Sequence, residues 1–294
     1  MSESTGQPSP VGQQLAMGHE RQRDLFGDSW LKSNEAQAAL NEFDLAGALA
    51  LLAPIAQSCP DDEALQKLTA TIKQLDGTLT GGVARSGSEC VTLLSLDAQV
   101  PDFLRSAWHR RVARAVEQES QLAADRAVAG CHYLRAGELV AAEQTLRSTL
   151  AELPFHALAR CHLADTLALQ GRLPAARIEY RNALAQHPAE VDWAGLVDRE
   201  VADLPAMAEL DYGVQGDPLE WTAVVGVIEG IFMTPTAAPN RKPTPGDSPV
   251  SPGLQFYDWM VAELAATDNA VRLTARRQLK AISPTMLAKY LTRH

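Results

Sequence analysis

Aromatic residues are scarce in this sequence of 294 residues, since Phe, Trp and Tyr together make up only 5% of it. Aromatic and β-branched residues favour strands, whereas Ala and Leu, which dominate the apolar residues here, favour helices. The scarcity therefore argues against a β-rich fold and predicts an all-α protein. Hydrophobic residues still reach 46%, which is enough for a sizeable core and excludes wholesale disorder.

The sequence also has no CxxC pair, no long apolar run and no secretory leader. Its four cysteines are widely spaced, which predicts reduced, buried thiols at Cys59, Cys90, Cys131 and Cys161. The longest apolar stretch, residues 222–233, contains Glu229 and is far shorter than the roughly twenty residues that a membrane span needs. The opening MSESTGQPSPVGQQ has no basic segment followed by an apolar one, as a signal peptide would. We therefore expect a cytoplasmic protein that makes no membrane contact.

Basic residues are outnumbered, with 26 Lys and Arg against 36 Asp and Glu, for a net charge of -10. Such a protein repels a phosphate backbone, so nucleic acid is disfavoured as a partner. The C-terminal residues 269–294 are an exception, because they contain no acidic residue and six basic ones: Arg272, Arg276, Arg277, Lys280, Lys289 and Arg293. This segment either docks on the protein's own acidic surface or binds an acidic partner.

A second basic cluster falls on a helix that Pro101 and Asp102 are expected to open. Its members spread around the helix, which predicts that they are solvated or paired with Glu117 and Glu119; they are Arg105, His109, Arg110, Arg111 and Arg114. We therefore expect no functional patch on this helix.

Glycine, proline and polar residues divide the chain into segments. We expect a flexible N-terminal arm at 1–28 and a Gly/Ser-rich loop region at 77–100, which holds Gly77, Gly81 and Gly82. A Pro-rich linker is expected at 234–253, where six of the 17 prolines fall. The remaining segments are predicted to be helical: degenerate repeats at 29–76, clearer repeats at 101–204, an apolar segment at 205–233 and a basic C-terminal module at 254–294.

The strongest signal is self-similarity at a period of 34 residues. The turn glycine, the small residue of the second helix and the closing proline all recur at this spacing, as Gly137 and Gly171, Ala142 and Ala176, and Pro154 and Pro188. Over 123–156 and 157–190, small residues fall where two antiparallel helices would cross, at Gly130 and Ala164. Large residues fall where side chains would have to fill the space between packed helices, at Tyr133, Leu146, Leu167 and Tyr180. Each 34-residue unit is therefore predicted to form a helix, a turn at glycine and a second helix that ends at proline.

This pattern resembles the tetratricopeptide repeat, a helix–turn–helix unit of the same length. Thr149 departs from it, because a small apolar residue is usual at that position. Residues 29–62 form a more degenerate candidate in which Phe43 replaces the turn glycine. The resemblance implies a right-handed α-solenoid of helix pairs, which a capping helix at 192–204 would end and a small C-terminal helical appendage would follow.

The resemblance also implies a concave groove lined by the first helix of each unit. The positions carried over are Ala127, Val128, Cys131, Leu134, Arg135, Leu158, Cys161, His162, Asp165 and Leu169. This groove is mainly apolar and lacks the dense basic clamp expected for a peptide C-terminus, so it suits an amphipathic helix or an extended peptide. The chain's own linker or C-terminal helices are the alternative occupants.

The sequence contains none of the common catalytic signatures, namely a Walker loop, GxSxG, HExxH and GxGxxG. Two Cys-His pairs, Cys131-His132 and Cys161-His162, raise the question of a metal site. Neighbouring residues on a helix point about 100° apart, however, so a Cys in the groove would turn its His away from it. We therefore expect buried thiols, surface histidines, no metal and no cofactor.

These observations predict a non-catalytic protein. The first hypothesis is an adaptor or assembly factor that binds another protein's peptide or helix in the groove. The alternative is an accessory or regulatory subunit of a larger enzyme or secretion complex, which would use its outer surface. A third class, disfavoured by the missing motifs, is an enzyme with its site near Glu220 and Glu229.

Overall fold

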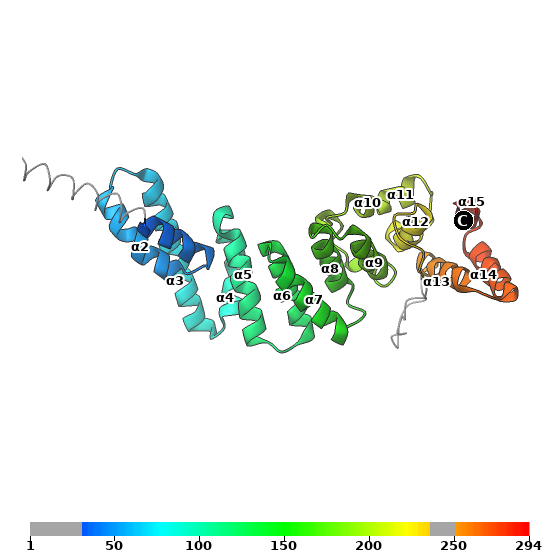
Figure 1. Ribbon diagram of the computed structural model, residues 1–294, viewed down its shortest axis with the longest axis horizontal. Coiled ribbons are helices and arrows are strands. Elements are labelled where there is room, and N and C mark those ends of the chain that lie inside the picture. Colours follow the sequence, from blue (N-terminus) through cyan, green and yellow to red (C-terminus); the bar gives the residue numbers. More distant parts are fainter. Residues whose placement is uncertain (1–30, 236–250, 294) are drawn as a thin grey trace, which may run out of the picture. The chain divides into compact units, whose positions relative to one another are not determined.

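The computed structural model describes residues 31–235 and 251–293, and all the regular structure in them is helical (Figure 1). The helices pack mainly against their sequence neighbours, as stacked helix pairs do. The chain divides into two compact units whose boundary falls between Ala115 and Val116. The predicted arm at 1–28 and most of the predicted linker at 234–253 lie outside the described residues.

The first unit begins with a helix over residues 31–41 and α2 (Leu45–Ser58). The turn between them places Phe43 at φ 57°, a left-handed conformation that glycine usually adopts. The Phe43 side chain is buried, and the Oδ1 atom of Asp44 accepts a hydrogen bond from the N–H of Gly47 to cap α2. Burial of the Phe43 ring thus offsets a backbone cost that glycine avoids at the turns of Gly137 and Gly171.

The prediction of a glycine-rich loop after residue 76 is wrong. Helix α3 (Glu63–Ser86) continues through Gly77, Gly81 and Gly82 and ends at Gly87, which has φ 70°. A Cβ atom on Gly82 would lie 2.3 Å from Cγ2 of Thr92, on helix α4 (Glu89–Ser95). Gly82 therefore allows α4 to approach α3 closely, so the glycine there serves packing and not chain flexibility.

Helix α5 (Asp102–Glu119) follows α4 and the single turn η1 (Asp97–Gln99). The indole Nε1 of the buried Trp108 donates to the carbonyl of Leu93 over 2.9 Å, which fixes α5 to the end of α4. Four basic residues of this helix pair with carboxylates of the same unit: Arg105 with Asp97, Arg110 and Arg114 with Glu42, and Arg111 with Glu89.

The second unit opens with two helix pairs that follow the predicted repeats. Helices α6 (Ala123–Ala136) and α8 (Ala157–Leu169) begin 34 residues apart, as do α7 (Leu139–Glu152) and α9 (Leu173–Leu184). The two turn glycines have φ values of 80° and 77°. A Cβ atom on Gly130 would lie 2.6 Å from the side chain of Leu146, so α6 and α7 cross at this small residue as expected.

The capping helix predicted at 192–204 does not form. The chain instead makes the single turns η2 (Pro188–Glu190) and η3 (Trp193–Gly195), then the short helices α10 (Arg199–Ala202) and α11 (Leu204–Leu210). Residues 196–198 are not helical, because Leu196 and Asp198 turn inward and are buried against the preceding pair. These contacts replace the regular packing of another helix.

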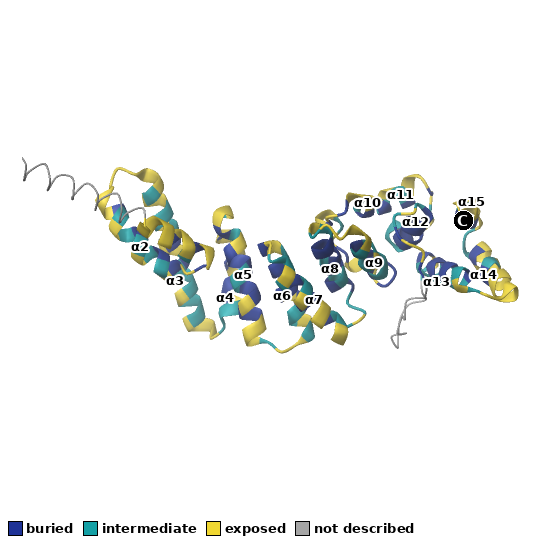
Figure 2. Ribbon diagram, viewed as in Figure 1, coloured by how far each residue is buried: buried dark blue, intermediate teal, exposed yellow. Residues whose placement is uncertain are grey.

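The apolar segment at 205–233 is helical only in part, because residues 211–217 and 229–233 form turns and irregular structure. After η4 (Pro218–Trp221), every residue of α12 (Thr222–Ile228) is buried, which explains the absence of any polar stripe in this sequence (Figure 2). Within the described residues, none of the helices is long and apolar enough to cross a membrane.

Three helices, α13 (Pro252–Ala265), α14 (Asn269–Ile282) and α15 (Pro284–Arg293), occupy the C-terminal segment that was predicted to be helical. We expected a separate module, but these helices belong to the same compact unit as α6–α12, and α13 and α15 both contact α12. A buried carboxylate, Glu263, joins them: it pairs with Arg276 at 2.8 Å and accepts a hydrogen bond from the hydroxyl of Tyr290 at 2.7 Å.

Candidate functional site

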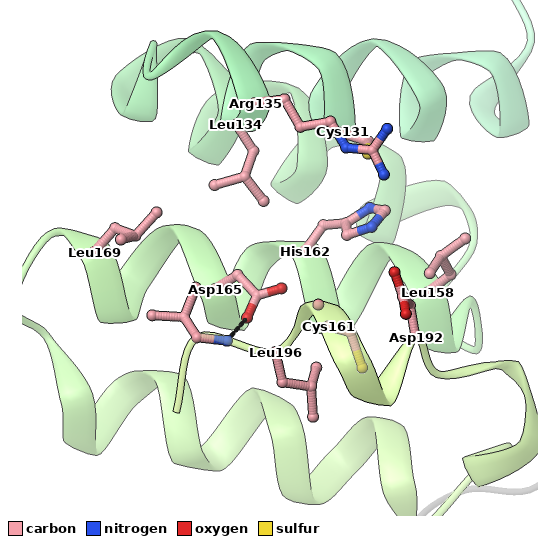
Figure 3. Close-up of a pocket in the computed structure, with 12 residues that line it drawn as sticks. Cys131, Leu134, Arg135, Leu158, Cys161, His162, Asp165, Leu169, Asp192 and Leu196 are labelled. Atoms are coloured by element: carbon pink, nitrogen blue, oxygen red, sulfur yellow. Dashed lines mark hydrogen bonds between the residues drawn. The ribbon is translucent and has the colours of Figure 1, made fainter. Parts of the chain in front are cut away.

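The groove residues predicted from the repeat lie on α6 and α8, and eight of the ten line a single recess (Figure 3). These eight are Cys131, Leu134, Arg135, Leu158, Cys161, His162, Asp165 and Leu169. The other two do not line it: Ala127 is buried and Val128 is exposed elsewhere on α6. The repeat offsets thus bring most of the predicted positions together.

A third wall of the recess comes from a segment that sequence reasoning assigned to a capping helix. Residues 192–197 contribute Asp192, Gly195, Leu196 and Val197, opposite α6 and across α8. The recess has a volume of about 200 Å³. It is therefore short, because this segment closes the side on which a further repeat would have extended the groove.

Hydrogen bonds and ion pairs anchor this third wall to the helix pair below it. The backbone N–H of Val197 donates to Oδ1 of Asp165 over 2.9 Å, and the hydroxyl of Tyr180 donates to the same oxygen. Arg177 on α9 pairs with the buried Asp198 at 2.8 Å. A polar residue on the buried face of α8 was the available sequence signal for this contact, although it did not identify the partner.

Burial sets the protonation of the Asp165 carboxyl. It raises the pKa of Asp165 to about 6, even though the hydrogen bonds from Tyr180 and Val197 favour the charged form. Burial and the neighbouring Asp165 likewise raise the pKa of Tyr180, which keeps the phenol protonated as a donor. Asp165 therefore acts within the structure as an internal acceptor, although it also lines the recess.

The polar groups that face the open part of the recess are His162, Arg135 and Asp192. Burial, with a further contribution from the nearby Arg135 charge, lowers the pKa of His162 to about 4, so the imidazole is neutral at pH 7. Its Nδ1 atom is buried and has no hydrogen-bond partner among the described residues. Figure 3 shows the Arg135 guanidinium and the His162 ring on the same side of the recess.

The two cysteines of the recess are thiols and not thiolates. Burial raises the pKa of Cys161 and of Cys131, so neither sulfur is activated as a nucleophile. Among the described residues, no group of three or more His, Cys, Asp or Glu side chains is placed to hold a metal ion. The expectation of surface histidines fails at His132, which is buried within α6.

The carboxylates considered for an enzyme site do not come together. Glu229 accepts a hydrogen bond from Tyr212 and pairs with Arg293, at a second recess that α15 helps to line. Glu220 does not line that recess. Arg293, one of the six basic residues of the C-terminal segment, is thus paired with a carboxylate of the protein itself.

Comparisons with known proteins found no match: no family model, no curated protein and no solved structure is significantly similar to this chain.

Proposed function

We propose that this protein is a non-catalytic adaptor or assembly factor that binds a peptide of another protein in the recess between α6 and α8. The observation that carries the proposal is the convergence of eight groove positions on one recess that stays open to solvent. Three of its leucines, Leu134, Leu158 and Leu169, leave apolar surface uncovered there. Apolar surface beside a few polar groups is typical of peptide-binding grooves.

The proposal includes a finer description of the architecture. The 34-residue spacing of the helix starts and the glycine turns support tetratricopeptide-like repeats in a right-handed α-solenoid. The reduced state expected for the four free cysteines supports a cytoplasmic location.

The test compares partner capture by the wild type and by a groove variant. In the variant, Arg135→Glu and Leu169→Asp change two exposed side chains of the recess and leave the buried Asp165 contacts intact. A matched control, Val140→Asp with Arg277→Glu, makes the same kinds of change at exposed positions outside the recess. Circular dichroism checks that all three proteins are equally helical, and quantitative mass spectrometry measures what each captures from native lysate.

We expect a protein that the wild type and the control capture equally and the groove variant loses. Capture that survives the groove changes would overturn the proposal. Capture that only the control loses would favour the alternative, an accessory or regulatory subunit that uses its outer surface, because Val140 and Arg277 lie on α7 and α14, outside the recess.

A further inference from the structure

We propose that the recess recognises a short extended peptide segment that carries an acidic side chain for Arg135, a basic side chain for Asp192 and an apolar side chain between them. This inference rests on the proposed function and adds the chemistry of the partner. It follows from the charges, the apolar surface and the unpaired polar atom of the site.

The charges come from opposite walls. Arg135 lies on α6 and Asp192 on the third wall, and both are exposed. Neither side chain has an ion pair or a hydrogen bond in the described part of the chain, whereas Arg126, Arg160 and Arg177 of the same unit all pair with carboxylates. Because the walls differ in sign, the site complements a segment with both charges better than it complements a polyanion.

The size of the recess favours an extended segment over a helix. Its volume of about 200 Å³ is below the roughly 300–1,000 Å³ typical of pockets for drug-sized ligands, so it has room for one large side chain. The third wall ends the groove after two helices, which leaves no long apolar channel for a helical face. Leu134 and Leu158 are only partly buried and would cover the apolar side chain.

The imidazole of His162 supplies the third feature. Its Nδ1 atom is buried without a hydrogen-bond partner among the described residues, and buried polar atoms of this kind are usually satisfied by a ligand or water. The ring is close enough to both charges for them to affect its pKa, which Arg135 lowers and Asp192 raises. The His162 ring therefore lies beside both charged groups that the bound segment would contact.

The experiment selects ligands from a phage-displayed library of short random peptides on the full-length protein. Enriched peptides are synthesised with a fluorophore and titrated by fluorescence anisotropy. Two double-mutant cycles follow: Arg135→Gln against neutralisation of the peptide's acidic residue, and Asp192→Asn against neutralisation of its basic residue. Crossed cycles, in which each variant meets the other neutralised peptide, are the matched controls.

We expect the enriched peptides to share an apolar residue flanked by one acidic and one basic residue. Each single neutralisation should weaken binding about two- to five-fold, as expected for exposed ion pairs, and the second change of a matched cycle should cost nothing more. In the crossed cycles the two losses should multiply. Arg135→Glu should weaken binding roughly tenfold.

Two other results separate this inference from the proposed function. The charge pattern would be overturned by peptides whose binding is abolished by Leu169→Asp but shows no coupling energy with Arg135 or Asp192. That result would leave the groove as the binding surface. Peptides that bind the Leu169→Asp variant as well as the wild type, or a library that yields no enriched peptide, would overturn both. Enrichment of peptides with acidic charge alone would assign the site to polyanions.

Discussion

At the scale of single residues, the glycines of α3 have two different roles in one helix. Gly81 and Gly82 are adjacent, but a Cβ atom on Gly81 would have no neighbour within 4 Å, whereas one on Gly82 would meet Thr92 at 2.3 Å. Thr92 is buried, and its hydroxyl donates to the carbonyl of Ser88, so it has little freedom to move. Local sequence cannot distinguish these neighbours, because the difference lies in a contact ten residues away.

The matched substitutions Gly81→Ala and Gly82→Ala test this difference. Gly81→Ala should raise the free energy of unfolding by roughly 0.5–1 kcal/mol, because alanine is the better helix former. Gly82→Ala should lower it by about 1–3 kcal/mol, because the added methyl group overpacks the contact with α4. Urea denaturation followed by circular dichroism measures both. Equal effects of the two changes would contradict the close approach of α4 to α3.

The elevated pKa of Asp165 predicts a pH-dependent effect of Asp165→Asn. The folded-state pKa of about 6 lies above the ordinary value of 3.8. Between pH 3.8 and 6 the folded protein therefore binds this proton more tightly than the unfolded chain does, and it loses stability as the pH rises through this interval. The loss amounts to at most about 3 kcal/mol. An asparagine Oδ1 atom can still accept from Val197 and Tyr180. The variant should therefore match the wild type near pH 4 and exceed it by roughly 1–3 kcal/mol at pH 7.

Urea denaturation of both proteins at a series of pH values measures this difference. His162 has the opposite effect on stability. Because its pKa is lowered to about 4, the folded state loses stability as the pH falls from about 6.5 toward 4. This effect is present in both the wild type and Asp165→Asn, so it cancels in the difference between them. Asp192→Asn, at an exposed carboxyl of the same recess, controls for the change in charge. A stability difference for Asp165→Asn that stays constant with pH would show that the carboxyl is not desolvated.

At the scale of elements, Glu263 holds the C-terminal helices together. Its carboxylate on α13 is buried and receives Arg276 from α14 and Tyr290 from α15. Replacing it with alanine removes the hydrogen bond from the buried Tyr290 hydroxyl and the ion pair with Arg276. Glu263→Ala should therefore destabilise the docking of α15 by roughly 2–3 kcal/mol, and Glu263→Gln by less, because the amide keeps an acceptor for Tyr290.

Hydrogen exchange of the α15 amides measures this docking. Protection in α15 should fall by one to two orders of magnitude in Glu263→Ala, as about 1.4 kcal/mol corresponds to a factor of ten. Glu209→Ala removes an exposed carboxylate of α11 and should leave exchange unchanged. If α15 kept its protection in Glu263→Ala, the carboxylate would not be what fixes the helix.

The predictability of these elements depended on where their defining interactions lie. The helices of the two repeats and of the C-terminal segment follow from local signals: the periodic small residues, the turn glycines, and a proline such as Pro284 at a helix start. The long helix α3 and the irregular segment at 192–198 do not follow from local signals. Both depend on tertiary contacts, namely Gly82 against Thr92 and Val197 with Asp165, which no short-range pattern records.

The candidate site divides in the same way. Two walls of the recess come from helix positions that recur with the repeat, so a fixed offset identified residues such as Arg135 and His162. The third wall, with Asp192, depends on how the chain leaves the last repeat, and there the periodic pattern has ended. The sequence could therefore predict the two walls formed by α6 and α8 but not the third wall at residues 192–197.

At the scale of the whole molecule, the distribution of charge matters more than its local clusters. The net charge is -10, and the basic residues of α5 are largely paired with carboxylates of their own unit. We expect the protein to pass unretained through a heparin column at about 150 mM salt, where screening limits attraction to about 8 Å. Retention that Arg277→Glu and Lys280→Glu abolish would instead assign α14 to an acidic partner.

The segment that closes the recess also limits how this chain can grow. In a stack of helix pairs each pair contacts mainly its neighbours, so a further pair could be added at an end or between two existing pairs. A helix pair added after α9 would have to displace residues 191–198, because Asp165 and Arg177 already bind the chain there. A unit inserted between His156 and Ala157 would meet only helix surfaces that pack against other helices in the present protein. The chain could therefore be lengthened at the internal junction between α7 and α8, whereas the contacts after α9 fix the C-terminal junction.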